Sequence, residues 1–115
     1  MNELIMRIFV GFTVDGTPVP VKFMYYEGHG EPYVFFMKQD ADNSLTGDDQ
    51  LIAHVEYYDF DVYAKGNYNT IVERVKEELT ANGFVWQVSR SSGDMFETDT
   101  GYYHTTLNFA IYRED

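Results

Sequence analysis

Residues 52–83, IAHVEYYDFDVYAKGNYNTIVERVKEELTANG, hold the two patterns that decide the fold. Alternate positions from Ile52 to Ala64 form one face of an extended chain, and that face is most clearly apolar in its second half. The opposite face carries Asp59, Asp61 and Lys65. A period of two predicts a long β-strand with one buried face.

The second half of this stretch changes to a helical period. Gly66-Asn67 ends the strand, and residues 70–73 (TIVE) have the spacing of a capping box, in which threonine and glutamate satisfy two free backbone amides. The apolar side chains that follow at helical spacing are Ile71, Val72, Val75 and Leu79, with Glu73, Lys76, Glu77 and Glu78 turned to water. Asn82-Gly83 supplies a left-handed exit. We therefore expect a helix over about residues 70–82.

The sequence before this stretch contains several strand signals. Residues 4–12 leave helix and strand open, and Ile8-Phe9-Val10 favours a strand weakly. A turn is expected at Asp15-Gly16, and alternation then predicts a strand over 19–26 that begins at a sheet edge, because Pro18 and Pro20 cannot donate to a ladder. Residues 32–38 (PYVFFMK) predict another strand, paired with the previous one as a hairpin.

The sequence after the helix predicts two more strands and completes the fold. Alternation favours strands over residues 84–89 and 102–113, with a turn at 91–94 between them. In the last strand, one face carries Leu107, Phe109 and Ile111 and the other His104, Thr106 and Asn108. The expected class is α+β, a single domain over residues 1–115. Its two layers are an antiparallel or mixed sheet and one main helix.

Composition limits the classes of function. The chain has 115 residues, 13.4 kDa and a formal net charge of −11, which opposes sequence-independent binding to nucleic acid or to an anionic membrane. Without cysteine there is no disulfide, thiol nucleophile or thiolate zinc site. No segment reaches the roughly 18 consecutive apolar residues of a spanning helix. We expect a soluble protein made in the cytoplasm.

Residues 39–50 (QDADNSLTGDDQ) are expected to form an exposed loop, because they are almost free of apolar side chains. The four aspartates in it are Asp40, Asp42, Asp48 and Asp49. They raise the alternative of a calcium site, but an EF-hand loop requires Gly and Glu where Leu45 and Leu51 stand. A solvated acidic loop is the preferred interpretation.

Catalytic and zinc motifs are missing from the sequence. His29, His54 and His104 have no HxH or HExxH spacing, so the sequence predicts no metal site. Asp59 and Asp61 alternate on the polar face of a strand, where solvated carboxylates are usual. No nucleophile elbow, phosphate loop or dinucleotide fingerprint occurs, and we expect no cofactor and no enzyme activity.

The ten tyrosines carry more information. Several stand in adjacent pairs, and adjacent residues of a strand face opposite sides, so one ring of each pair points away from the core. The pairs are Tyr25-Tyr26, Tyr57-Tyr58 and Tyr102-Tyr103. Scattered surface aromatics are one interpretation. The other, which we prefer, is a protein interface, because aromatic residues and methionine are enriched there.

The order of these features resembles one family of proteins. An aromatic strand ends at Tyr25-Tyr26, a Pro-Tyr-Val strand and an Asp/Asn-rich segment follow, and YDFDVYAK precedes a Glu-rich helix that ends in NGFVW. DMFETDTGYYHTTLNFAIYRED completes the pattern. Together they resemble the tail terminator, or tail-to-head joining, proteins of long-tailed phages and prophages of Gram-positive bacteria, over about the last hundred residues.

The resemblance implies a structural virion protein of the head-tail junction, assembled in the cytoplasm of the bacterial host. Its partners would be copies of itself in a hexameric ring, the major tail tube protein and the head-tail connector protein, with DNA passing through the pore unbound. The expected interface or lumen residues are Tyr26, Asp40, Asp42, Asp48, Asp49, Tyr57, Asp59, Asp61 and Tyr102. The acidic segment 40–49 would line the lumen or an axial face.

Two alternatives remain open. Another small head-tail connector or head-completion protein would have similar features and differ in the partner that it caps. A small acidic ligand-binding domain or enzyme, with a pocket between sheet and helix, belongs to a different class.

Overall fold

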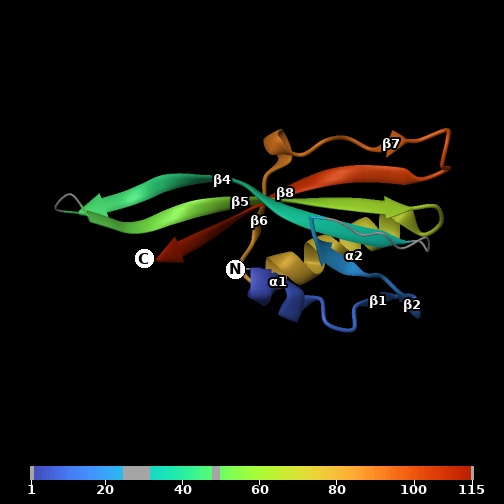
Figure 1. The fold of residues 1–115 in the computed structure, drawn as a ribbon, viewed down its shortest axis with the longest axis horizontal. Coiled ribbons are helices and arrows are strands. Elements are labelled where there is room, and N and C mark those ends of the chain that lie inside the picture. The colour runs from blue at the N-terminus through green and yellow to red at the C-terminus, as the bar shows by residue number, and fades with distance from the viewer. Residues whose placement is uncertain (1, 25–31, 48–49, 115) are drawn as a thin grey trace.

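The computed structural model describes residues 2–24, 32–47 and 50–114, and their side chains outside 40–53 and 114. Two α-helices, one 3-10 turn and eight strands follow one another in these ranges (Figure 1). They are α1 (Asn2–Ile8), β1 (Thr13–Val14), β2 (Thr17–Pro18), β3 (Val21–Phe23), β4 (Tyr33–Gly47), β5 (Gln50–Ala64), α2 (Tyr68–Ala81), β6 (Val85–Trp86), η1 (Val88–Arg90), β7 (Met95–Phe96) and β8 (Tyr103–Glu114).

The main sheet has the strand order β3-β4-β5-β8-β6, and β7 also pairs with β8. All its pairs are antiparallel except β3 with β4, so the sheet is mixed. Both α-helices lie on one side of this sheet (Figure 1). The predicted two-layer α+β fold with one main helix is confirmed, with α1 as a short addition.

The core lies between the sheet and the helices. Phe60, in the second half of β5, is fully buried, and its ring lies 5.7 Å from that of Phe36, 5.9 Å from Phe109 and 6.3 Å from Phe84. The predicted inward face of α2 is buried as well, with Ile71, Val72, Val75 and Leu79 at 7% exposure or less. The periodicities of the strand and the helix were therefore interpreted correctly.

The start of α2 differs from the prediction. The helix begins at Tyr68, and Asn67 occupies the N-cap position in the left-handed conformation (φ 55°) without a side-chain cap. Thr70 therefore lies inside the first turn, and the predicted capping box is wrong. The predicted exit is confirmed, because Gly83 has a φ of +90° and its amide donates to the Thr80 carbonyl.

The weak preference for a strand over residues 4–12 is wrong. Residues 2–8 form α1, and Ile5 and Phe9, one helical turn apart, are both buried. This spacing outweighs the local β-propensity of Ile8-Phe9-Val10. The predicted turn at Asp15-Gly16 is confirmed: both residues have positive φ, and they join β1 to β2.

The predicted hairpin between the strands over 19–26 and 32–38 is also wrong. β3 is shorter than expected and pairs with β4 in parallel, with Val21 opposite Val34 and Phe23 opposite Phe36. Residues 25–31 lie outside the described ranges. The predicted edge position is confirmed, because β3 is the outermost strand on its side of the sheet.

Within the segment 39–50, expected as an exposed loop, the described residues 39–47 and 50 instead extend two strands. β4 continues to Gly47 and β5 begins at Gln50, with register shifts after Lys38, Asn43 and Leu45. Backbone pairing with the facing strand here overrides the poor strand propensity of Asp, Asn and Gly. We call the described residues 40–47 and 50–57 of this hairpin the arm; Figure 1 shows these strands projecting from the body, beyond the helices.

The segment after α2 is an interrupted strand along β8. Only Val85 and Trp86 of the predicted strand over 84–89 pair, as β6; the chain then makes the η1 turn, and Trp86 and Val88 are exposed while Phe84 is buried. Residues 91–94, predicted as a turn, run on beside β8, where the Ser92 amide donates to the Thr106 carbonyl at 2.9 Å. The segment then pairs again as β7.

Candidate functional site

One face of the sheet has no α-helix packed on it, and we call it the open face. Register places its side chains in rows across β4, β5 and β8. The rows are Tyr33, Tyr63 and His104; Phe35, Asp61 and Thr106; and Met37, Asp59 and Asn108. All of these except the buried Asn108 are partly exposed. Aromatic rings and carboxylates therefore lie side by side on a surface that water reaches.

The aromatic rings of the open face stack on one another. Tyr63 is the centre, with its ring parallel to that of Tyr33 at 4.8 Å and to that of His104 at 4.7 Å. Phe35 stacks at 5.7 Å from Tyr63, and Tyr102 meets it edge-on at 6.0 Å. Burial and the charge of Asp61 raise the pKa of Tyr63 to about 12, so the phenol stays neutral. The rings form a rigid apolar platform.

Asp59 and Asp61 lie two residues apart on the same face of β5, beside this platform. Asp61 accepts a hydrogen bond from the Thr106 hydroxyl, and Asp59 accepts one from the Asn108 amide at 2.8 Å. Neither carboxylate forms an ion pair with a lysine or arginine of the described residues. Burial, together with the neighbouring Asp59, raises the pKa of Asp61 despite the Thr106 hydrogen bond.

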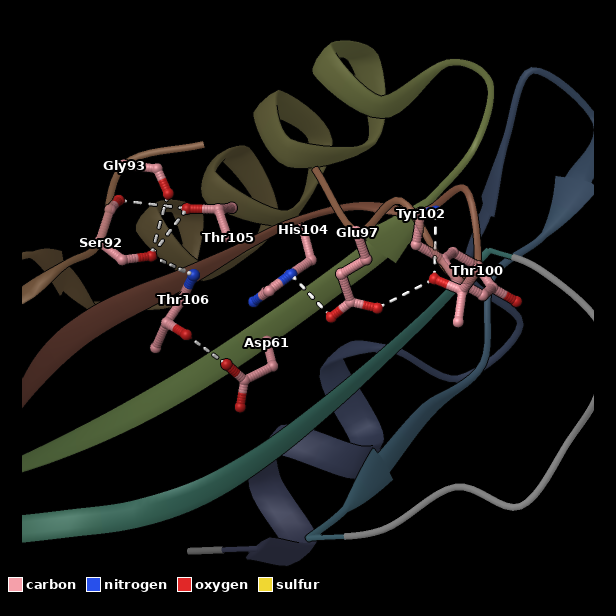
Figure 2. A network of polar contacts seen from close by, with 9 residues as sticks. All are labelled: Asp61, Ser92, Gly93, Glu97, Thr100, Tyr102, His104, Thr105 and Thr106. Carbon is pink, nitrogen blue, oxygen red and sulfur yellow. Dashed lines mark hydrogen bonds and ion pairs between the residues drawn. The ribbon is translucent and has the colours of Figure 1, made fainter. Parts of the chain in front are cut away.

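A polar network fastens the segment after η1 to the open face (Figure 2). Glu97 approaches His104 Nδ1 at 3.3 Å and accepts from the Thr100 hydroxyl at 3.0 Å, and Thr100 Oγ1 accepts from the Tyr102 amide. Ser92 Oγ accepts from the Thr106 amide at 2.9 Å. These contacts hold Tyr102 and His104 in place beside the stacked rings.

The η1 turn covers the other end of this face. The Arg90 guanidinium lies 3.7 Å from the centre of the Tyr57 ring. Asn108 is 3% exposed, and its amide oxygen accepts no hydrogen bond. The partly exposed carboxylates of Asp59 and Asp61 on the same face suit a partner that brings hydrogen-bond donors or positive charge.

Replacing Asp61 with asparagine is expected to raise the melting temperature at neutral pH. A carboxyl group whose pKa is raised by folding costs stability when it is ionised, and an asparagine keeps an acceptor for Thr106. The advantage of Asp61→Asn should shrink as the pH falls through the raised pKa, because wild-type Asp61 then becomes neutral. Thermal denaturation at several pH values measures this.

Asp99→Asn, at an exposed position, is the matched control for charge removal. A lower melting temperature for Asp61→Asn at neutral pH would contradict the expected cost of this carboxylate.

The structure brings four of the predicted interface residues to the open face, namely Tyr57, Asp59, Asp61 and Tyr102. Asp40 and Asp42 lie in the β4 strand of the arm, and their side chains are outside the description. Tyr26, Asp48 and Asp49 lie outside the described residues. Tyr33, Phe35 and Tyr63 were not predicted as interface residues, although their alternation with buried neighbours would have placed them on this face.

A second cluster lies on the helix side, at the base of the arm, and sequence reasoning missed it. The Glu56 carboxylate is within 2.9 Å of His54 Nε2 and accepts from the Tyr58 hydroxyl at 3.1 Å and from Lys38 at 3.4 Å. Arg113 approaches it at 3.9 Å. The sequence feature that could have indicated this cluster is the pair of polar residues, His54 and Glu56, on a strand face that is otherwise apolar.

The Glu56 cluster joins β4, β5 and β8 by one buried carboxylate. Burial alone would raise the pKa of Glu56, but the hydrogen bonds from His54 and Tyr58 and the charge of Lys38 lower it below its ordinary value. A hollow of about 500 Å³ adjoins the cluster and is also lined by Asn2 and Glu3. The Glu56 carboxylate thus connects side chains of three strands by ion pairs and hydrogen bonds, and we call this group the charged clamp.

A further hollow of about 540 Å³ lies at the start of α2 and is lined by residues that include Lys65, Asn69, Asp94 and Tyr103. Tyr68 donates to Asp94 there at 2.7 Å. Within the described ranges, no three His, Asp or Glu side chains lie close enough together to hold a metal ion. No helix of the described chain is long and apolar enough to cross a membrane.

Comparison of the chain with protein-family models gives no match. Comparison with curated protein sequences gives no match either.

Proposed function

We propose that this chain is a tail terminator, or tail-to-head joining, subunit of a long-tailed phage or prophage. It works by contact: it caps the tail tube and docks the head connector, and it performs no reaction. The observation that carries the proposal is the open face, where stacked rings and the carboxylates of Asp59 and Asp61, which have no ion pair with a described lysine or arginine, remain partly exposed across three strands.

The composition of the open face suits a protein partner. Aromatic residues and methionine are enriched in interfaces because they remove much apolar surface from water with few rotatable bonds. Tyr33, Phe35, Met37 and Tyr63 supply such side chains, and the stacking between rings fixes their orientation before a partner arrives. Asp59 and Asp61 add charge that can select a partner of opposite sign.

The arm supports an assembly role. Within the described residues, β8 pairs with β5 as far as Ala53, and beyond that pair the arm is a two-stranded ribbon of β4 and β5. Such ribbons are marginal in water unless they pack on something else. We infer that the tip rests on a neighbouring subunit, on the major tail tube protein or on the connector protein.

The charge of the chain suits a pore that DNA passes through without binding. A formal charge of −11 on 115 residues repels phosphates, and a ring of such subunits would let the genome slide. The arm carries the acidic residues Asp40 and Asp42, and we keep the proposal that this segment faces the lumen or an axial side of the ring.

Electron microscopy of particles from a strain that lacks the gene tests the function. Loss of a terminator removes the stop to tube polymerisation, so overlong tails that are not attached to heads are expected. Loss of a head-completion or connector protein would instead leave unattached tails of normal length. Normal virions from the deletion strain would contradict both virion roles.

Complementation with variants makes the test specific to the open face. Wild-type chain supplied from a plasmid should restore normal virions, and Tyr63→Ala/Phe35→Ala should not. The matched control is Glu73→Ala/Glu77→Ala on the exposed side of α2, which should complement fully. Circular dichroism of each variant separates loss of contact from loss of folding.

A further inference from the structure

Large apolar side chains that remain exposed are concentrated at two places in the described chain. The first, which we call the α1–β3 edge, has Met6, Val10, Phe23 and Met24 at 38% to 78% exposure. The second, the β6–β7 edge, has Val85, Trp86, Val88, Met95, Phe96 and Tyr103 at 39% to 66% exposure. Among the described residues only Tyr112, near the end of β8, lies outside both groups.

The two edges lie on opposite sides of the molecule. β3 is the outermost strand on one side of the sheet, and β6 and β7 flank β8 on the other. Figure 1 shows α1 and β7 at opposite sides of the view. Because β3 has three residues and β6 and β7 two each, these strands offer little backbone for pairing with another chain. Contacts made there depend on side chains.

Free positive charge is confined to the α1–β3 edge. Six of the eight lysines and arginines have partners within the chain: Lys38 and Arg113 with Glu56, Arg74 and Lys76 along α2, Lys76 also over the Trp86 ring, and Lys65 and Arg90 over tyrosine rings. Arg7 and Lys22 are the two described cations without an ion pair or ring contact.

The β7 end of the β6–β7 edge has the opposite charge, whereas at its β6 end the Lys76 ammonium lies 3.7 Å from the centre of the Trp86 ring. Asp94, Glu97 and Asp99 stand on or beside β7, and no lysine or arginine of the described chain pairs with them. The contacts of Asp94 and Glu97 are with tyrosine, threonine and histidine. An apolar edge with two free cations therefore lies opposite an apolar edge with three carboxylates.

We propose that the α1–β3 edge of one copy docks on the β6–β7 edge of the next. The occupant is a second copy of this chain, because the two halves of a complementary contact, in apolar character and in charge, are on the same molecule. Two different patches on opposite sides make a heterologous contact, which repeats head to tail and forms a ring where the rotation between neighbours closes. The inference deepens the proposed function and rests on it.

A hollow of about 400 Å³ between α1 and β3 is suited to the contact. Its walls include Met6, Val10, Val21 and Lys22. An exposed apolar side chain of β7, Met95 or Phe96, is of the kind that fills such a hollow, while Arg7 and Lys22 meet the carboxylates around it. Burial of the apolar side chains stabilises the contact, and the charges set its register.

Cysteine cross-linking tests this arrangement, because the chain has no cysteine of its own. Val10→Cys and Thr98→Cys place one thiol beside each edge without removing a charge. At millimolar chain concentration, a short bifunctional thiol reagent should join the double variant into a ladder of trimers and larger species. An equimolar mixture of the two single variants should stop at dimers, because each copy then has one thiol.

The matched control is Val10→Cys/Glu73→Cys, with the second thiol on the exposed side of α2; it should give no ladder. Arg7→Glu/Lys22→Glu in the Val10→Cys/Thr98→Cys background should lower the yield of the ladder about tenfold, as expected for a loss of about 1.4 kcal/mol.

Two results would overturn the proposal. The double variant could give no species larger than a dimer, or Val10→Cys alone could cross-link to itself, which would show a two-fold symmetric contact instead. A ladder together with normal virions from the deletion strain would support the self-contact and contradict the proposed function. Overlong tails without a ladder would support the proposed function and contradict this contact.

Discussion

Phe60→Ala is expected to destabilise the protein by about 3–5 kcal/mol, the usual cost of truncating a buried aromatic residue. The side chain is fully buried, and its ring contacts come from four separate parts of the chain, through Phe9, Phe36, Phe84 and Phe109. A cavity there loosens both helices from the sheet at once. Since domains have about 5–15 kcal/mol of stability, the loss is a large share of the total.

Urea denaturation followed by circular dichroism measures this effect. The control is Val88→Ala, which removes apolar atoms from a side chain that is 66% exposed and should change the free energy of unfolding by less than about 0.5 kcal/mol. A loss below about 1 kcal/mol for Phe60→Ala would mean that the two layers do not depend on this aromatic cluster.

Glu56→Gln should have the second largest effect, a loss of about 2 kcal/mol, because hydrogen bonds to a charged group are stronger than those to a neutral amide. Glu56 is 9% exposed, and its carboxylate faces His54, Lys38 and Arg113. Without its charge, the Lys38 and Arg113 cations repel one another at the base of the arm. Lys38 and Arg113 are partly open to water, which keeps the loss below that of a fully buried ion pair.

The same residue predicts a dependence on pH. Folding lowers the pKa of Glu56, so its contribution is fully present above the ordinary glutamate pKa and disappears as the pH falls through the lowered value. The difference in unfolding free energy between wild type and Glu56→Gln should therefore be large at neutral pH and small in strong acid. Denaturation curves from neutral pH to about pH 3 test this.

Glu77→Gln on the exposed side of α2 is the control, since its i,i+3 contact with Arg74 at 3.7 Å is open to solvent. It should change stability by less than about 0.5 kcal/mol at any of these pH values. Equal effects of Glu56→Gln at neutral and acid pH would show that its amide volume, and not the charge, matters.

Sequence periodicity correctly predicted the buried faces of those elements in which apolar residues recur at a regular spacing along the chain. The inward positions of β5 from Tyr58 to Ala64, the apolar stripe of α2 and the alternation of β8 follow from the period of each element, which depends only on which side is buried. The same alternation put Tyr57, Asp59 and Asp61 on the side away from the helices. Much of the open face was therefore predictable.

The errors came from contacts between distant residues. The parallel pairing of β3 with β4, the extension of β4 and β5 into the arm and the break of the strand after α2 at η1 depend on which backbone groups find partners across the sheet. Residues such as Asp42 and Asn43 disfavour strands by themselves, yet a facing strand satisfies their backbone groups. Local propensity carries no information about that partner.

Amino-acid order alone was enough for the α+β class, the main helix, the two best-patterned strands and an acidic, aromatic surface, because each follows from short-range spacing and composition. Long-range folding was needed to gather Lys38, Glu56 and Arg113 into one clamp and to separate Arg7 and Lys22 from the carboxylates around β7. These groups come from segments far apart in the chain, so the distances between them are set only when the strands have paired in the sheet.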